Sequence, residues 1–140
     1  MDIKIFTDGG SRGNPGISGA GAVVFDDKGI ELGTNLKFLG KKTNNWAEYE
    51  AVILGLELAH KLFDKKTQEI NFEMKMDSQL VQRQLKGEYR VKEDSLKEQF
   101  LRVHNLIVKY FPNIKFTHIP REENKRADEL ANEAMDEGGL

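Results

Sequence analysis

The segment DIKIFTDGGSRGNPG, residues 2–16, decides how the rest of the chain is interpreted. Residues 2–7 alternate between apolar and polar side chains, a pattern that is typical of a β-strand. The following residues contain four glycines, an asparagine and a proline, which favour a tight turn. We therefore expect the strand to end at Asp8, beside a glycine-rich loop that a large ligand can approach closely. An ordinary turn with a solvated aspartate is the alternative for this segment taken alone.

The amino-acid composition limits the classes of protein to which this chain can belong. The chain has 140 residues, of which 39% are hydrophobic and 31% charged, as expected of one soluble globular domain. It contains no cysteine, which excludes disulfides and thiolate metal sites and leads us to expect a cytoplasmic location. We expect neither a signal peptide nor a membrane helix, because Met1 leads directly into the first strand and no apolar run is long enough. The net charge of −2 gives no general attraction to nucleic acid.

Hydrophobic periodicity predicts an α/β fold. Besides residues 2–7, alternation predicts strands at residues 20–25, 30–39, 70–76 and 114–118. Helical spacing predicts helices at residues 44–63, 78–85, 96–110 and 127–134, the first capped by Thr43 or Asn44. Because crossover connections are right-handed, strands four and five should run parallel to the first, while the first three form an antiparallel meander. We therefore expect a mixed five-stranded sheet with helices on both faces.

Four acids stand out by position. Asp8 and Asp77 follow predicted strands, Glu48 lies near the start of a helix, and Asp128 lies near the start of the last helix. Carboxylates brought together repel one another unless cations neutralise them, and oxygen-only clusters suit hard ions such as Mg²⁺ or Mn²⁺. Two such ions about 4 Å apart can assist an in-line phosphoryl displacement. Each acid alone is more often a solvated surface charge, and spacing alone does not show that the four converge.

Four segments in order, TDGGSRGNPG, TNNWAEYEAVILGLE, MDSQLV and IPREENKRADELANEA, resemble the motif set of the ribonuclease H type 1 family. The resemblance implies a ribonuclease H-like fold. It implies an endonuclease that hydrolyses the RNA strand of RNA/DNA hybrids with two Mg²⁺ ions, or Mn²⁺ as a substitute, leaving 5′-phosphate and 3′-hydroxyl ends. In this reading Asp8 bridges the two ions, Asp128 helps to hold the ion that activates water, and Glu48 and Asp77 hold the other.

The same resemblance implies a set of substrate contacts. An enzyme that cuts RNA opposite DNA has to sense 2′-hydroxyl groups, and amides suit this because they both donate and accept hydrogen bonds. The implied contacts are the amides Asn14, Asn44, Asn45 and Gln79, the backbone of Ser11, Arg12 and Gly13, and a phosphate contact from Thr43. Helix capping or turn formation is the alternative role of each asparagine.

Two departures from the family pattern are visible. Residues 87–92 stand where many members insert a basic helix and loop, so we expect a single domain over residues 1–140 without the basic protrusion. Arg121 stands in the place that matches the flexible-loop histidine of the family, whereas His118 matches an earlier position. His118 continues a strand face with Ile114 and Phe116, so we interpret it as a structural histidine and both residues as auxiliary candidates.

Three alternatives remain open. The same chemistry could extend to double-stranded RNA, since both substrates carry 2′-hydroxyl groups. A non-catalytic hybrid-binding module is the alternative from another class, and the presence of all four acids argues against it. A transposase-like relative on the same fold is disfavoured by the GNPG and TNNWAE segments. We expect a monomer whose partner is an RNA/DNA hybrid and not a membrane.

Overall fold

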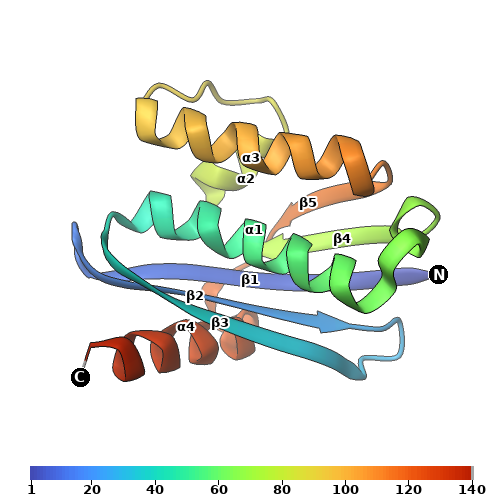
Figure 1. Ribbon diagram of the computed structural model, residues 1–140, viewed down its shortest axis with the longest axis horizontal. Coiled ribbons are helices and arrows are strands. Elements are labelled where there is room, and N and C mark those ends of the chain that lie inside the picture. The colour runs from blue at the N-terminus through green and yellow to red at the C-terminus, as the bar shows by residue number, and fades with distance from the viewer. Residues whose placement is uncertain (140) are drawn as a thin grey trace.

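The computed structural model describes residues 1–139 as one sheet covered by helices (Figure 1). The strands are β1 (Asp2–Gly13), β2 (Gly16–Phe25), β3 (Glu31–Lys42), β4 (Asn71–Met76) and β5 (Ile114–His118). The helices are α1 (Asn44–Phe63), α2 (Gln79–Leu85), α3 (Asp94–Tyr110) and α4 (Lys125–Gly138), with short 3₁₀ turns at Asp64–Gln68 and Arg121–Glu123.

The sheet has the strand order β3-β2-β1-β4-β5. β1, β2 and β3 are antiparallel neighbours, while β4 runs parallel to β1 and β5 parallel to β4. The mixed five-stranded sheet predicted from the sequence is therefore confirmed, and so is the order of helices and strands along the chain.

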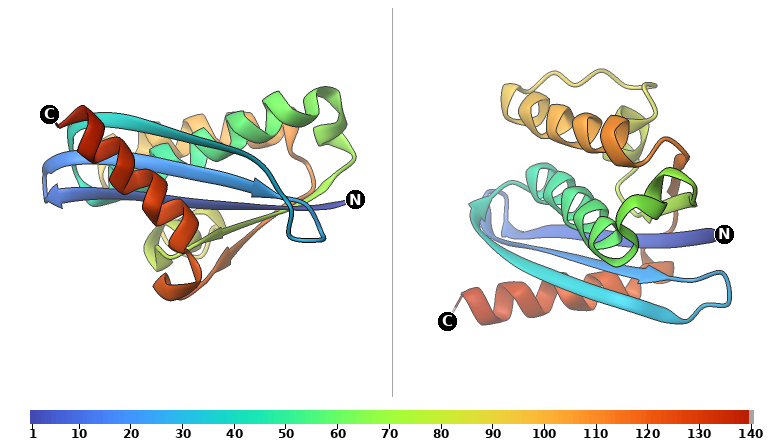
Figure 2. Two further views of the ribbon diagram at one scale, coloured as in Figure 1. Left: turned by 90° about the horizontal axis from the view of Figure 1, so that it is seen from below. Right: turned by 45° about the vertical axis from the view of Figure 1, so that its right-hand side comes forward.

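The helices form layers on both faces of the sheet (Figures 1 and 2). α1 packs directly on β1 and β2, and α3 packs on the outer side of α1. α4 covers the opposite face over β2, β3 and β1. Because α1 lies between the sheet and α3, it is buried over most of its length, whereas α4 buries only one stripe. Among the described residues no helix combines the length and the apolar character that crossing a bilayer requires.

One prediction about the first strand is wrong. β1 does not end at Asp8 but continues to Gly13, paired throughout with β2, and only Asn14 and Pro15 form the turn. The pairing with β4 does stop at Thr7, opposite Met76. The glycines are compatible with the strand because hydrogen bonding to β2 outweighs their weak strand propensity. The segment is thus a long hairpin that projects beyond the end of β4.

Two glycines allow helices to touch this hairpin at the main chain. A Cβ at Gly9 would lie 2.1 Å from the carbonyl oxygen of Ala47, in the first turn of α1. A Cβ at Gly21, the β2 residue opposite Asp8, would lie 2.5 Å from the carbonyl oxygen of Ala127 in α4. Side chains at these positions would push the helices away from the sheet, so the glycines set how closely α1 and α4 approach β1 and β2.

Gly9→Ala tests the contact between α1 and β1. We expect it to lower the free energy of unfolding by at least about 2 kcal/mol, because an added methyl group has no space beside main-chain atoms. Gly10→Ala is the control, since the nearest atom to its added Cβ is Cε of Met135 at 3.9 Å. We expect Gly10→Ala to change the same quantity by no more than about 0.5 kcal/mol in urea unfolding. Equal effects of the two substitutions would contradict the contact.

Candidate active site

Four acids from four elements meet in one hollow of about 520 Å³. Asp8 comes from β1, Glu48 from α1, Asp77 from the residue after β4, and Asp128 from the first turn of α4. Asp8, Glu48 and Asp77 each place a carboxylate oxygen within 4.8 Å of the others. Asp128 lines the same hollow, close enough to Asp8 for a hydrogen bond between their side chains. The structure therefore brings together the four acids that the sequence singles out.

The backbone explains why these side chains converge. Asp8 faces α4, because residues on a strand alternate and its neighbours Thr7 and Gly9 face α1. Glu48 reaches Asp8 because α1 starts in direct contact with Gly9. Asp77 directly follows Met76, where the pairing of β1 with β4 ends. Asp8 and Asp77 are thus near neighbours at the carboxyl end of the parallel strands, where sites in open α/β sheets form.

Burial and the repulsion between like charges raise the pKa values of three acids in this cluster. Burial raises the pKa of Asp8 to about 8, and the negative charges of Asp77 and Asp128 add to the effect. Burial and the charge of Asp8 also hold the pKa of Glu48 well above its usual range. The pKa of Asp77 is raised by burial, although an Asn124 hydrogen bond and the charge of Arg121 oppose that effect. Three carboxylates that resist ionisation together, with only oxygen donors, fit a hard divalent cation that neutralises them.

The two arginines at the hollow differ in how firmly they are held. The guanidinium of Arg12 forms an ion pair of 2.7 Å with Asp136 and a hydrogen bond of 3.2 Å to Oδ1 of Asn132, both on α4. Arg12 therefore ties the hairpin to α4. Arg121 lies on the loop before α4, is exposed, and acts on Asp77 through its charge.

His118 does not belong to this hollow. It is the last residue of β5, pairs in register with Met76, and is not among the residues that line the hollow. Its side chain is exposed, so it is less buried than Ile114 and Phe116, whose strand face it was expected to continue. His118 ends the edge strand of the sheet, whose other edge residues are at most half-buried.

Half of the residues expected to contact substrate border the acids. Ser11, Arg12, Asn44 and Asn45 line the hollow. The Ser11 N–H donates to Oδ1 of Asn44 at 2.9 Å, and the Asn44 N–H donates to Oδ1 of Asn14 at 3.0 Å. These bonds turn both carboxamide oxygens towards the main chain, so the Nδ2 groups of Asn14 and Asn44 are the donors left for a ligand.

The remaining predicted contacts lie at the margin of the hollow. Gly13 ends β1 with a φ of 94°, a conformation that favours glycine. Thr43 caps α1, as predicted, with its hydroxyl accepting a hydrogen bond of 3.3 Å from the Trp46 N–H. Gln79 is the exposed first residue of α2, next to Ser78, which lines the hollow.

Two asparagines of this region were not predicted from the sequence. Asn132 lines the hollow, and its Nδ2 donates to the carbonyl oxygen of Asp128 at 3.0 Å. Asn124 is buried directly before α4, and its Nδ2 donates to the carbonyl oxygen of Thr7 at 2.9 Å. Their only signal in the sequence is a spacing of four residues on either side of Asp128, which is one helical turn.

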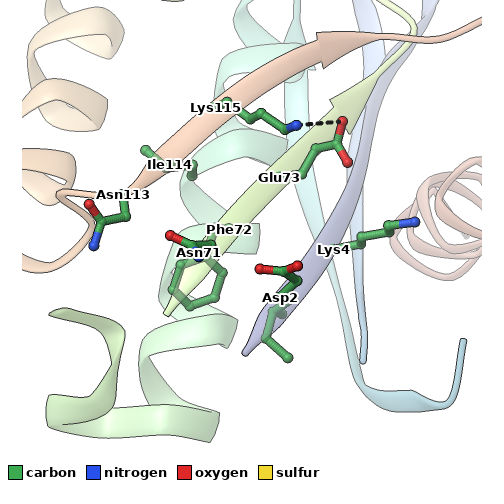
Figure 3. Close-up of a pocket in the computed structure, with 9 residues that line it drawn as sticks. Asp2, Lys4, Asn71, Phe72, Glu73, Asn113, Ile114 and Lys115 are labelled. Atoms are coloured by element: carbon green, nitrogen blue, oxygen red, sulfur yellow. Dashed lines mark ion pairs between the residues drawn. The ribbon is translucent and has the colours of Figure 1, made fainter. Parts of the chain in front are cut away.

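A second hollow, of about 510 Å³, lies at the amino ends of β1, β4 and β5 (Figure 3). Its charges are of mixed sign. Lys115 pairs with Glu73 at 4.0 Å, and Asp2 and Lys4 lie beside them (Figure 3). No cluster of like charges forms there, which distinguishes it from the hollow that contains the four acids.

Comparisons with known proteins agree with this geometry. The family described as reverse transcriptase-like matches residues 6–134. Ribonuclease HI of Halobacterium salinarum is 38% identical over 96% of this chain, which spans 65% of that protein. Bifunctional protein Rv2228c of Mycobacterium tuberculosis is 40% identical over 97% of this chain, which spans 36% of that protein. Among solved structures, LC11-RNase H1 in complex with an RNA/DNA hybrid is 47% identical and has a TM-score of 0.95, with 99% of both chains covered.

The match extends over both the sheet and the segments that carry the acids, and it covers almost the whole chain. The chain therefore belongs to the ribonuclease H type 1 family.

Proposed function

We propose that this chain hydrolyses the RNA strand of RNA/DNA hybrids and leaves 5′-phosphate and 3′-hydroxyl ends. The observation that carries the proposal is the meeting of four carboxylates beside a hairpin and a helix start that offer amide donors. A relative of similar length, LC11-RNase H1, has been crystallised with such a hybrid, which supports the choice of substrate.

The acids are proposed to hold two divalent ions, Mg²⁺ or, as a substitute, Mn²⁺. Asp8 is in reach of each of the other acids, since its carboxylate lies within 4.8 Å of those of Glu48 and Asp77 and within hydrogen-bond reach of Asp128. This supports Asp8 as the shared ligand, Glu48 and Asp77 as ligands of one ion, and Asp128 as a ligand of the second. Bound divalent ions supply an activated water and stabilise the leaving oxygen of a phosphodiester.

The side chains around the acids favour attack by water. Two serines line the hollow: Oγ of Ser11 lies within hydrogen-bond distance of the carbonyl oxygens of Gly13 and of Lys42, the latter at 2.9 Å, and Oγ of Ser78 accepts a hydrogen bond of 3.3 Å from the Val81 N–H. Both hydroxyls are held by the main chain, and among the described residues no histidine lines the hollow to activate them. A serine nucleophile would require such a base, so a covalent intermediate on this chain is disfavoured.

The rim of the hollow is proposed to select the substrate. The Nδ2 groups of Asn14 and Asn44, with Asn45 and Gln79 nearby, suit 2′-hydroxyl groups in a shallow minor groove. The main chain of Ser11, Arg12 and Gly13 adds further polar groups on the same side. Thr43 is proposed to contact a phosphate of the DNA strand, and Arg121 offers a positive charge beside the acids.

We also propose that the chain is a single domain without a basic protrusion. α2 ends at Leu85 and α3 begins at Asp94, and the connection between them contains no helix. Fewer phosphate contacts imply weaker hybrid binding than a protrusion would provide.

Asp128→Asn separates catalysis from binding. We expect it to lower hybrid cleavage more than about 100-fold, because the amide cannot replace a carboxylate ligand of the ion that activates water. The affinity for the hybrid should be retained, since the amide donors on the rim are unchanged. Cleavage of a labelled hybrid with Mg²⁺ and with Mn²⁺, beside a binding titration, measures both quantities. Double-stranded RNA is the substrate control, and equal cleavage by the variant and the parent would refute the role of Asp128.

The stability of the metal-free protein should depend on pH through Asp8. Its pKa rises from 3.8 to about 8 on folding, so between these values the unfolded chain releases a proton that the folded chain retains. The free energy of unfolding in EDTA should therefore fall from about pH 4 to about pH 8 and then level off. Mg²⁺ should reverse the loss at high pH, because it binds the ionised carboxylates.

Asp8→Asn is the control for this profile, because its side chain does not titrate. Relative to the parent in EDTA, it should become steadily more stable as the pH rises through this range, and it should gain less from Mg²⁺. Urea unfolding at several pH values measures the difference. Parallel profiles of the two proteins would show that Asp8 does not resist ionisation in the folded state.

A further inference from the structure

Asn124 is a buried polar residue at the start of α4 that the proposed chemistry does not use. It is 1% exposed and directly precedes the helix. Asparagine is common at this position because its side-chain oxygen accepts a hydrogen bond from the first turn. Here the side chain makes no such bond. Its position is therefore not explained by capping.

The side chain and the main chain of Asn124 make hydrogen bonds at two of the acids, one beside Asp8 and one at Asp128. The side-chain Nδ2 donates to the carbonyl oxygen of Thr7 at 2.9 Å, across 117 positions of the sequence. Thr7 precedes Asp8 and is the last β1 residue that pairs with β4. The main-chain oxygen of Asn124 accepts a hydrogen bond of 3.1 Å from the N–H of Asp128. One residue thus connects the backbone beside Asp8 with the backbone of Asp128.

Asn124 also lies beside Asp77, and its carboxamide opposes the rise in the pKa of Asp77 that burial causes. Its Oδ1 is buried and has no hydrogen-bond partner among the described residues. An unpaired buried acceptor destabilises a fold, and an apolar side chain of similar size would avoid that cost. Packing alone therefore does not account for an amide at this position.

Other ties between α4 and the hairpin are weaker. The ion pair of Arg12 with Asp136 joins side chains that are 46% and 66% exposed, and such pairs contribute little in water. Gly21 allows α4 to approach the sheet but offers no directional bond. The hydrogen bond from Asn124 to Thr7 is buried and directional, so it is the contact best suited to fix where the first turn of α4 lies.

We propose that Asn124 is a positioning residue of the acid cluster. Its carboxamide holds the start of α4, and with it Asp128, against the place where the pairing of β1 with β4 ends, which is followed by Asp8 and Asp77. The inference rests on the proposed function, because its effect is on the divalent ions that these acids would hold. Partners that orient metal ligands in this way typically contribute a factor of about 10 to 100 in metal affinity.

Asn124→Ala, compared with Gln82→Ala, tests the proposal. Gln82 is a matched control, since it is 6% exposed and its Nε2 donates to a strand carbonyl, that of Phe116, at 3.0 Å, outside the hollow. Both variants should melt at a lower temperature than the parent. Calorimetric titration with Mn²⁺ alone should show a dissociation constant that is about 10 to 100 times higher for Asn124→Ala and unchanged for Gln82→Ala.

Each outcome either supports or overturns the positioning role of Asn124. Parental Mn²⁺ affinity in Asn124→Ala, or an equal loss in Gln82→Ala, would overturn the positioning role while leaving the proposed function intact. A parent protein that binds no Mn²⁺ and cleaves no hybrid would overturn the proposed function itself, and this inference with it. If Asn124→Ala does not fold, Asn124→Ser, which keeps a small polar side chain that is too short to reach Thr7, is measured in its place with the same expectation.

Discussion

The main chain of α1 lies directly against the main chain of β1 at Gly9, where no side chain fits. This contact sets the depth of α1 over the sheet and brings Glu48 beside Asp8. It also fixes the layer above, because α3 attaches to the same part of α1. Gln99 of α3 donates to the buried carboxylate of Glu50 at 3.2 Å, and Arg102 pairs with the same group. Gly9 positions the start of α1, and Gly55 in the middle of α1 allows a second close approach, to the side chains of Ile5 and Thr7 on β1.

The acid cluster is a source of instability in the folded chain without metal. Burial and like charges raise the pKa of Asp8, Glu48 and Asp77, so ionising them together costs free energy. The core beneath is apolar and closed, with Ile3 and Ile5 fully buried, and it keeps the acids together despite their repulsion. Stability given up at a site in exchange for function is a general feature of enzymes.

Most of the fold could be predicted from the sequence, and particular residues show why. Ile3 and Ile5 stand two residues apart, so they point to the same face of the strand, and both lie in the core. The extent of β1 was predicted wrongly, because glycines at Gly9 and Gly10 suggest a loop when the partner strand is unknown. Pairing with β2 decides the outcome, and such pairing is a tertiary effect.

The site could be anticipated only in part. Motif resemblance points to the four acids, whereas their spacing in the sequence does not show that they meet. Asn124 was missed because its hydrogen bond spans 117 positions, a relation that no local pattern encodes. His118 continues an apolar alternation on β5, yet it is exposed at the end of an edge strand, which the alternation alone does not reveal.

The long hairpin has one more consequence. Past Thr7, β1 has a strand partner on one side only, and along its other edge Gly9, Gly10, Ser11 and Arg12 border the hollow. An unpaired edge exposes peptide N–H and C=O groups, which in other proteins invite aggregation. Here the side chain of Asn44 accepts a hydrogen bond from the N–H of Ser11, and the Glu48 carboxyl group interacts with the backbone of Gly9. The other peptide groups along this edge of β1 form a surface whose chemistry does not depend on the side chains. This wall of the site can therefore stay constant while the residues around it vary.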